Sequence, residues 1–300
     1  MTLLTLDHLL IAVRDLDAGA ADYDRLLGRA PSWRGRHPQY GTANVLYRLG
    51  NGYLELLVPD PDGEHSPWRD ALEGALDRTG EGIYAIALGT DDIDATVACA
   101  RERDLTVANP APGDGVDLIT GAARRWRNAR IDPAGTRGIN AFFIQHDSPP
   151  GSLPPARSTA GGGGHATAFD HIVVASSGLA ATLRLWQETF GLDHRLALDT
   201  PNGRRLHFLR MGTATPQDGE GAILELAGEA EPERPGDRDV LWGVAYRVDS
   251  VARAVERLRR AGVEVSDARP GNAPGTVVAD IKPGFSRDVR TLLIEKEARV

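Results

Sequence analysis

Cysteine is almost absent from this chain, since Cys99 is the only one among 300 residues. A single cysteine excludes an intramolecular disulfide and a cysteine-based zinc site, and it fits a reducing compartment. Hydrophobic runs long enough to span a bilayer are also missing, and residues 1–5 lack the basic start and apolar core of a signal peptide. We therefore expect a cytoplasmic protein that acts on a small molecule.

An excess of basic residues is lacking too, because the formal net charge is −8. Nucleic acids and anionic membranes are bound by concentrated basic surfaces, so neither is an expected partner. A chain of this length can form two domains, each with a hydrophobic core of its own.

The most informative feature of the sequence is an internal repeat. The stretch Leu6–Val13, which places Asp-His near the start of an apolar strand, returns as Phe169–Ala175. A predicted helix follows each copy, and later a strand carries Leu-Glu-Leu around Glu55 or Glu225. Such self-similarity indicates a repeated structural unit.

Two weaker copies of the first strand, at Ile83–Leu88 and Leu241–Val248, make four β-α-β-β-(β) modules of the α+β class. We expect an N-terminal domain at 1–148, a linker rich in proline and glycine at 149–167, and a C-terminal domain at 168–300. Because one module exposes a face of its curved sheet, modules should pair around a concave cavity. The pattern leaves open whether they pair within a half or across the halves.

This organisation resembles the vicinal oxygen chelate superfamily, which includes glyoxalases, methylmalonyl-CoA epimerase, extradiol dioxygenases and proteins of fosfomycin and bleomycin resistance. The N-terminal half resembles its glyoxalase-like domains through His37-Pro38, Gly41-Thr42, Asn44 and the segment Gly52–Leu57. The resemblance implies four βαβββ modules that form two glyoxalase-like half-barrel domains.

The resemblance also implies a divalent metal in a cup, held by residues of the first and last strands of paired modules. Carried over by position, the ligands would be His8, Glu55, Ala85 and Gln145 in one cup and His171, Glu225, Gly243 and Glu295 in the other. Ala85 and Gly243 stand where a second histidine is usual, and Gln145 replaces a common glutamate. The remaining His171, Glu225 and Glu295, or more weakly His8, Glu55 and Gln145, suit Mn, Fe, Ni, Zn or Co.

Each candidate ligand has a structural alternative. His8 and His171 could bond to local backbone, and Glu295 could lie in a fraying terminus. Glu55 and Glu225 interrupt apolar strands, where an uncompensated carboxylate is costly, so we expect both to face a cavity. We also expect Gln145 to face the cavity and the next residue, His146, to point away.

Other side chains are candidates for substrate contact, with core packing or a solvated strand as the alternative. Arg125 and Arg127 flank Trp126, and two guanidiniums beside an indole could clamp an anionic or planar ligand. The remaining candidate cavity-lining residues are Asn44, Tyr53, His207, Trp242 and Tyr246. His207 or His194 could also reach a metal from another strand.

The leading functional hypothesis is a metal-dependent isomerase, epimerase or lyase. It would act on a carbonyl compound through a metal-stabilised oxyanion, and Glu225 or Glu295 would move the proton. The alternatives are a non-catalytic drug or natural-product binding (resistance) protein and an extradiol-type dioxygenase. One half could also be an inactive scaffold, and exposed sheet edges make a homodimer a candidate state.

Overall fold

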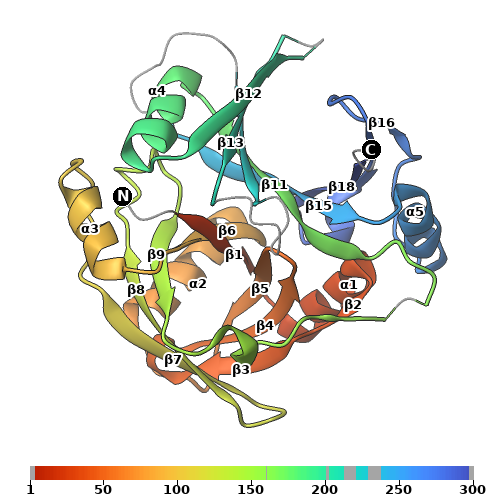
Figure 1. Cartoon of the computed structure of the whole chain (residues 1–300). Helices are drawn as coiled ribbons and strands as arrows, with labels where there is room; N and C mark the ends of the chain where they lie inside the picture. Colours follow the sequence, from red (N-terminus) through yellow and green to blue (C-terminus); the bar gives the residue numbers. More distant parts are fainter. Residues whose placement is uncertain (1–3, 160, 201–202, 213–220, 229–237, 297–300) are drawn as a thin grey trace.

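Two eight-stranded sheets form the body of the molecule. The computed structural model describes residues 4–159, 161–200, 203–212, 221–228 and 238–296. Figure 1 shows the two sheets side by side, the first in red to yellow-green and the second in green to blue. Within the described residues, every helix is too short or too polar to cross a membrane.

The element order repeats the module four times. In the first half the strands are β1 (Thr5–Ala12), β2 (Arg29–Ala30), β3 (Trp33–His37), β4 (Thr42–Leu49), β5 (Gly52–Pro59), β6 (Gly82–Gly89), β7 (Ala111–Asp117), β8 (Ala123–Arg130) and β9 (Ala141–His146). In the second half they are β10 (Arg157–Ser158), β11 (Ala166–Ser176), β12 (Asp193–Asp199), β13 (Arg205–Arg210), β14 (Ile223–Gly228), β15 (Val240–Val248), β16 (Arg269–Pro270), β17 (Thr276–Ile281) and β18 (Arg290–Lys296). The helices are α1 (Leu16–Leu27), α2 (Pro67–Thr79), α3 (Ile93–Arg101), α4 (Leu179–Arg184) and α5 (Val251–Arg260).

The N-terminal sheet closes into a barrel with the strand order β1-β5-β4-β3-β7-β8-β9-β6. Its two modules meet through the antiparallel pair β1–β6, and each first strand runs parallel to its module's last strand. On the far side, β3 joins β7 through only two residue pairs, Gly35 with Asp117 and Arg36 with Val116. A Cβ at Gly35 would lie 2.7 Å from the Val116 carbonyl oxygen, so glycine is needed for this close approach.

The C-terminal sheet has the corresponding order β12-β13-β14-β11-β15-β18-β17-β16 and stays open. Its modules meet through the antiparallel pair β11–β15. Modules therefore pair sequentially within each half, which the sequence left open. The α+β class and the glyoxalase-like architecture are confirmed, with one closed barrel and one half-barrel.

Local sequence explains why these elements begin and end where they do. Asp15 caps α1, its carboxylate accepting a hydrogen bond from the Ala18 amide at 2.9 Å, and Gly28 ends the helix in the left-handed conformation. The helix predicted after the second copy of the repeat is α4 only as far as Arg184, and a π-helical turn continues it to Thr189. Strand β7 has no strand-like sequence pattern, because it is rich in glycine and aspartate.

The segment expected as a linker at 149–167 is packed against both halves. Its strand β10 pairs with β2, and the Gly164 amide donates to Asp249 at 2.6 Å. The β4–β5 turn also joins the halves, because the Asn51 side chain donates to the Phe169 carbonyl and accepts from its amide, both at 2.9 Å. The largest hydrophobic cluster accordingly includes residues of both sheets.

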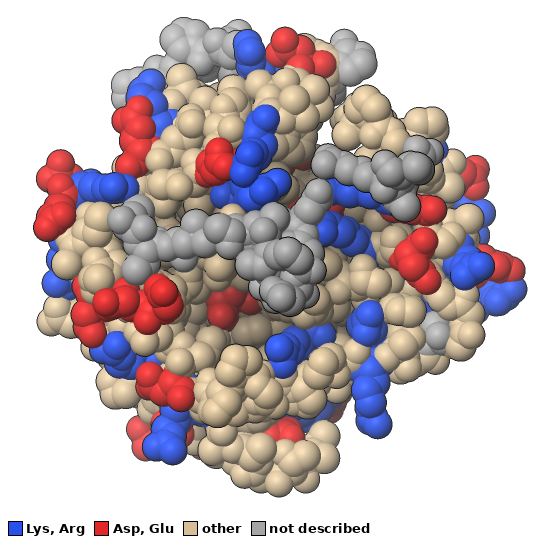
Figure 2. Space-filling model, viewed as in Figure 1, with Lys and Arg blue, Asp and Glu red and all other residues tan. Residues whose placement is uncertain are grey.

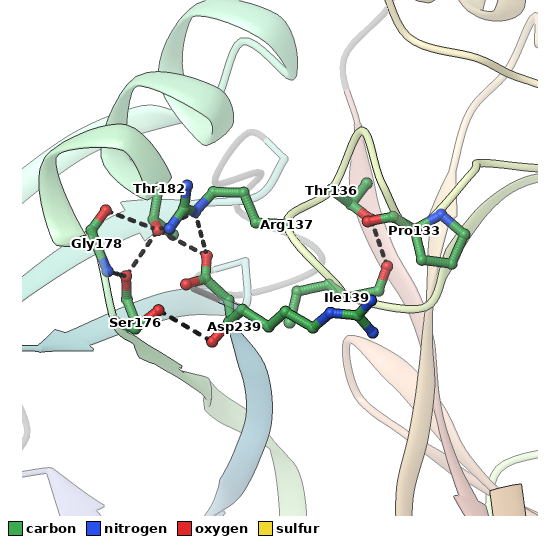
Figure 3. Close-up of polar contacts among 10 residues, drawn as sticks. Pro133, Thr136, Arg137, Ile139, Ser176, Gly178, Thr182 and Asp239 are labelled. Atoms are coloured by element: carbon green, nitrogen blue, oxygen red, sulfur yellow. Dashed lines mark hydrogen bonds and ion pairs between the residues drawn. The ribbon is translucent and has the colours of Figure 1, made fainter. Parts of the chain in front are cut away.

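A second junction between the halves is polar. Arg137, in the loop before β9, donates to Asp239 and to the Thr182 hydroxyl, each at 3.1 Å (Figure 3). The Thr182 hydroxyl donates in turn to Asp239 at 2.6 Å. Elsewhere, Figure 2 shows basic and acidic side chains interspersed over the visible face.

Candidate functional site

The interior of the N-terminal barrel contains a small cavity of about 70 Å³. Aromatic rings and a few polar side chains enclose it. The lining residues are His8, Leu10, Trp33, His37, Tyr40, Thr42, Asn44, Leu46, Tyr53, Glu55, Leu57, Trp68, Tyr84, Arg124, Trp126, Asn128, Phe142 and Ile144. The expected cavity residues His8, Asn44, Tyr53, Glu55 and Trp126 are therefore together at one place.

A buried histidine and a buried glutamate face each other in this cavity. Adjacent strands β1 and β5 bring His8 Nε2 to 3.2 Å from Glu55 Oε2. On the other side of the ring, His8 Nδ1 lies 2.6 Å from Asp7 Oδ1. Two carboxylates thus accept from the two ring nitrogens, which favours the imidazolium.

The ionisation of this pair follows from its contacts. Burial would lower the pKa of His8, but the hydrogen bonds and charges of Asp7 and Glu55 raise it above the ordinary value. Burial would raise the pKa of Glu55, but the hydrogen bond and charge of His8, with a further bond from Asn44, lower it. A proton donor and an ionised carboxylate therefore lie side by side.

A second histidine in the cavity is held neutral. His37 Nδ1 lies 3.1 Å from the Thr42 hydroxyl, and the Asn44 amide nitrogen approaches His37 Nε2 at 3.1 Å and Glu55 Oε1 at 2.7 Å. Burial lowers the pKa of His37, and the charge of Arg124 lowers it further. His37, Thr42 and Asn44, which are among the residues that carried the resemblance in the N-terminal half, thus form one hydrogen-bonded network with Glu55.

Strand β8 supplies cavity residues, but the arginine that faces the cavity is not one of the two that the sequence analysis proposed. Alternation along the strand puts Arg124, Trp126 and Asn128 in the cavity wall. The expected clamp residues Arg125 and Arg127 face outward: Arg125 is exposed, and Arg127 pairs with Asp94 at 2.8 Å. The two arginines therefore do not flank a ligand beside Trp126.

Arg124 was not singled out in the sequence analysis, although it lies two residues before Trp126 and would therefore share its face of a strand. Its side chain is only 7% exposed, and its guanidinium lies 5.3 Å from the Tyr53 ring centre and 5.7 Å from that of Trp33. Tyr53 stacks on His8 with ring centres 4.3 Å apart, so one ring contacts both cationic groups. Arg124 and Tyr53 also line a cleft of about 450 Å³ between the halves.

Two predicted ligands face away from the cups. Phe142 and Ile144 of β9 point into the barrel, so alternation turns Gln145 outward, where its side-chain oxygen accepts from the Ile93 amide at the start of α3. In the same way Glu295 accepts from the Val251 amide at the start of α5, at 2.8 Å. Both side chains cap helices, and it is His146, 3.0 Å from Asp7, that lies on the inner side.

The C-terminal cup repeats the histidine–glutamate pair in a different environment. His171 Nε2 lies 3.5 Å from Glu225 Oε2, and His171 Nδ1 lies 2.9 Å from Asp170. The cup is much larger than the barrel cavity, at about 1350 Å³. The expected contact Trp242 lines it, with the Arg290 guanidinium 4.4 Å from its ring centre.

Other expected contacts of that cup lie elsewhere. His207 turns away from the cup, and its Nδ1 approaches His194 Nε2 at 3.0 Å. Tyr246 is fully buried in the main hydrophobic cluster, 5.5 Å from the Phe169 ring. None of these three side chains, His194, His207 and Tyr246, is placed to bind a ligand beside His171.

Strand register identifies the true equivalents of the glutamates. Glu55 pairs with the residue two positions after His8, and Glu225 with the residue two positions after His171. In the even-numbered modules the same relationship, counted from Ala85 and Gly243, leads to Phe142 and Leu292. In each cup, two of the four positions that would hold a metal ligand are therefore occupied by residues without a metal-binding side chain.

A divalent metal does not fit the donor sets that remain. Catalytic sites of this kind use at least three protein ligands, and among the described residues no three His, Cys, Asp or Glu side chains converge on one point. In the barrel, His8 donates to carboxylates from both ring nitrogens and His37 Nε2 accepts from Asn44. The expected sets with Gln145 or Glu295 are not brought together.

Comparison with known proteins supports the same architecture. Residues 6–190 match the family model described as a glyoxalase-like domain, and residues 170–279 match the glyoxalase/bleomycin resistance protein/dioxygenase superfamily. Two examples are taken from the solved structures that cover 100% of this chain. They are a mutant of 4-hydroxymandelate synthase from Streptomyces coelicolor (TM-score 0.67, 16% identity, 95% of that chain) and the Mn(II)-bound glyoxalase from Novosphingobium aromaticivorans (TM-score 0.63, 17% identity, 84% of that chain). At these identities they show a shared fold.

Curated relatives match over shorter segments. Mitochondrial methylmalonyl-CoA epimerase of Homo sapiens is 34% identical over 101 residues, which are 33% of this chain and 54% of that protein. The ethylmalonyl-CoA/methylmalonyl-CoA epimerase of Cereibacter sphaeroides is 36% identical over 99 residues, which are 33% of this chain and 66% of that protein. The chain thus spans between half and two thirds of these relatives. With a family model matching well over half of its length, the chain belongs to the glyoxalase-like domain family of the vicinal oxygen chelate superfamily.

Proposed function

We propose that this protein is an enzyme that moves a proton on a small carbonyl compound, as an isomerase or epimerase, inside the N-terminal barrel. The observation that carries the proposal is the buried pair of His8 and Glu55, which face the cavity 3.2 Å apart with pKa values shifted in opposite directions. Pairs of groups whose environments separate their ionisation are typical of acid–base sites.

In the proposed reaction Glu55 takes the proton from the carbon next to a carbonyl group. The C–H bonding pair moves into a new carbon–carbon double bond, and the carbonyl π pair moves onto oxygen, giving an enolate. As Glu55 takes up the proton, the His8 Nε2–H leaves Glu55 and donates its hydrogen bond to that oxygen, which is where negative charge develops. Glu55 then returns the proton: delivery to a neighbouring carbon gives an isomer, and delivery to the opposite face, after the planar enolate has turned over in the cavity, gives an epimer. Acid–base groups of this kind contribute ~10²–10⁴-fold to a rate.

The N-terminal site is favoured over the C-terminal cup because of its polar network. Asn44 bonds to Glu55, whereas strand register puts Leu206 at the corresponding place beside Glu225. Burial raises the pKa of Glu225 above its ordinary value, with a further rise from Asp170. An ionised base is therefore better supported at Glu55.

The activities of the relatives agree with this reaction class. Two epimerases of CoA thioesters and a glyoxalase are among them. We do not propose a metal-dependent variant, because the donor set described above does not reach three protein ligands. For the same reason the extradiol-type reaction, which uses a two-histidine, one-carboxylate site, is not proposed.

Deuterium incorporation tests the proposal without knowledge of the natural substrate. Pyruvate, 2-oxobutyrate and methylglyoxal are incubated with the protein in D₂O, and loss of the proton signal next to the carbonyl group is followed by NMR. Glu55→Gln should slow exchange by ~10²–10⁴-fold, whereas the matched Glu225→Gln should exchange like the wild type. If Glu225→Gln slowed deuterium exchange and Glu55→Gln did not, the reaction would be assigned to the C-terminal cup instead.

Non-catalytic ligand binding is the second candidate function. The observation in its favour is the enclosure of the cavity by aromatic rings, including Trp33, Tyr53 and Trp126. Tight binding of an aromatic compound with no proton exchange on any of the three probes would support this alternative and overturn the enzyme proposal.

A further inference from the structure

We infer that Arg124 is an anion anchor in the barrel cavity, and that the ligand is a small carboxylate-bearing carbonyl compound such as a 2-oxo acid. The inference rests on the proposed function for the identity of the carbonyl group. The binding of the carboxylate follows from the surroundings of Arg124 alone.

Arg124 is a buried cation without a carboxylate partner among the described residues. Its side chain is only 7% exposed, yet the ion pairs of the described chain do not include it. Other low-exposure arginines have oxygen acceptors: Arg137 pairs with Asp239, Arg287 pairs with Asp22, and Arg257 donates to backbone carbonyl oxygens. Buried charges are ordinarily paired, so the position of Arg124 needs an explanation.

The aromatic contacts of Arg124 do not supply a counter-charge. The faces of Tyr53 and Trp33 attract a cation, but they leave the guanidinium N–H groups without an anionic acceptor. Burial raises the pKa of Tyr53 well above its ordinary value, so that ring stays neutral. The guanidinium fork matches a carboxylate, which it can bind through two parallel hydrogen bonds.

The carboxylates around the cavity are both committed to His8. The charged side chains that line the cavity are His8, Glu55 and Arg124. His8 is held between Glu55 at 3.2 Å and Asp7 at 2.6 Å, and neither carboxylate forms an ion pair with Arg124. A carboxylate on the ligand supplies Arg124 with an anionic contact of its own.

The size of the cavity limits the ligand. One water-sized group needs about 10–15 Å³, so a cavity of about 70 Å³ accepts roughly five to seven non-hydrogen atoms. Short 2-oxo acids have this size. With the carboxylate on Arg124, the adjacent carbonyl group is left for His8 and Glu55.

The test compares two probes of nearly equal shape, 2-oxobutyrate and its neutral isostere 2,3-pentanedione. Dissociation constants are measured by calorimetry for the wild type, Arg124→Met, Arg124→Lys and the outward-facing control Arg125→Met. We expect Arg124→Met to weaken 2-oxobutyrate binding by about 10- to 100-fold, the range for a lost charge-assisted hydrogen bond. Binding of 2,3-pentanedione should be unchanged, Arg124→Lys should restore part of the loss, and Arg125→Met should match the wild type.

Unchanged pentanedione binding shows that the Arg124→Met cavity is folded. If the variants do not fold, the wild type decides alone: failure to bind 2-oxobutyrate more tightly than 2,3-pentanedione overturns the inference. Equal loss in Arg124→Met and Arg125→Met overturns it as well. Deuterium exchange at C3 of 2-oxobutyrate and at C4 of 2,3-pentanedione separates this inference from the proposed function. If 2-oxobutyrate binding depends on Arg124 but no exchange occurs, only the enzyme proposal is overturned. If exchange is equally fast for both probes and does not depend on Arg124, only the inference about Arg124 is overturned.

Discussion

Glu55 and Glu225 occupy the same register position in the two halves, but their pKa values are shifted in opposite directions. The difference comes from their neighbours. Glu55 accepts from Asn44 at 2.7 Å and faces His8 at 3.2 Å, whereas Glu225 faces His171 at 3.5 Å beside apolar Leu206. The two glutamates should therefore affect stability with opposite sign.

Replacing each glutamate by glutamine tests this sign. A lowered pKa in the folded state means that Glu55 stabilises the fold above its unfolded pKa, near 4.5, and that the contribution is lost as pH falls. Glu55→Gln should thus lower Tm at pH 7, by an amount that shrinks toward pH 4. A raised pKa means that ionised Glu225 costs stability at neutral pH, so Glu225→Gln should raise Tm at pH 7 and lose that gain below about pH 4.5. Thermal melts from pH 4 to 8 check both, and parallel curves for the two variants would contradict the assignment.

Asp7 should control the charge of His8. Asp7→Asn removes the acceptor that raises the pKa of His8. His8 must be protonated in the proposed reaction, so activity falls as pH rises through its pKa. The alkaline limb of the deuterium-exchange profile should therefore move to lower pH, and the rate at pH 7 should drop by about 10- to 100-fold, part of the contribution of an acid–base group. The matched variant in the other half, Asp170→Asn, should leave the profile unchanged.

Glu295 should act on stability alone. Glu295→Ala removes the acceptor of the Val251 amide at the start of α5 and should cost ~1 kcal/mol, as loss of a helix cap does, or about 2–4 °C in Tm. Glu295→Gln keeps an acceptor oxygen and should stay near the wild-type Tm. A change in 2-oxobutyrate binding in either variant would contradict the outward orientation of Glu295.

The contact between the halves can be tested at Asn51. Asn51→Ala leaves the backbone amide and carbonyl of Phe169 without their partners, which should cost about 1–3 kcal/mol. The free energy of unfolding from urea titration measures this loss. Asn109→Ala, which removes an exposed amide paired with Arg101, is the control and should stay within about 0.5 kcal/mol of the wild type.

The sequence was sufficient for the repeat, the four modules and the inward-facing His8 and Glu55, because apolar strands with an embedded charge are a strong local signal. It was not sufficient for the last strands. Gln145 and Glu295 were assigned to the cups, but which residues pair across parallel strands depends on register, and a shift of one reverses every face. Arg124 was hidden for a related reason. Strand β8 is rich in arginine on both faces, so composition alone did not separate the inner guanidinium from Arg125 and Arg127.

The short pairing between β3 and β7, here called the seam, has a consequence for how a ligand reaches the cavity. Two residue pairs join β3 to β7, whereas eight join β4 to β5. In the strand order the seam lies opposite the β1–β6 pair, and β4 separates it from β5, so neither strand that carries His8 or Glu55 is part of the seam. Local opening is easiest where few backbone bonds must break, so in hydrogen-exchange mass spectrometry we expect the β3 and β7 amides to exchange before those of β1 and β5. The barrel can then widen on one side while its proton-transfer pair stays rigid. The seam is therefore a way in for the ligand: a short 2-oxo acid can enter between β3 and β7, and the resting volume of the cavity still decides which ligands stay in contact with His8 and Glu55.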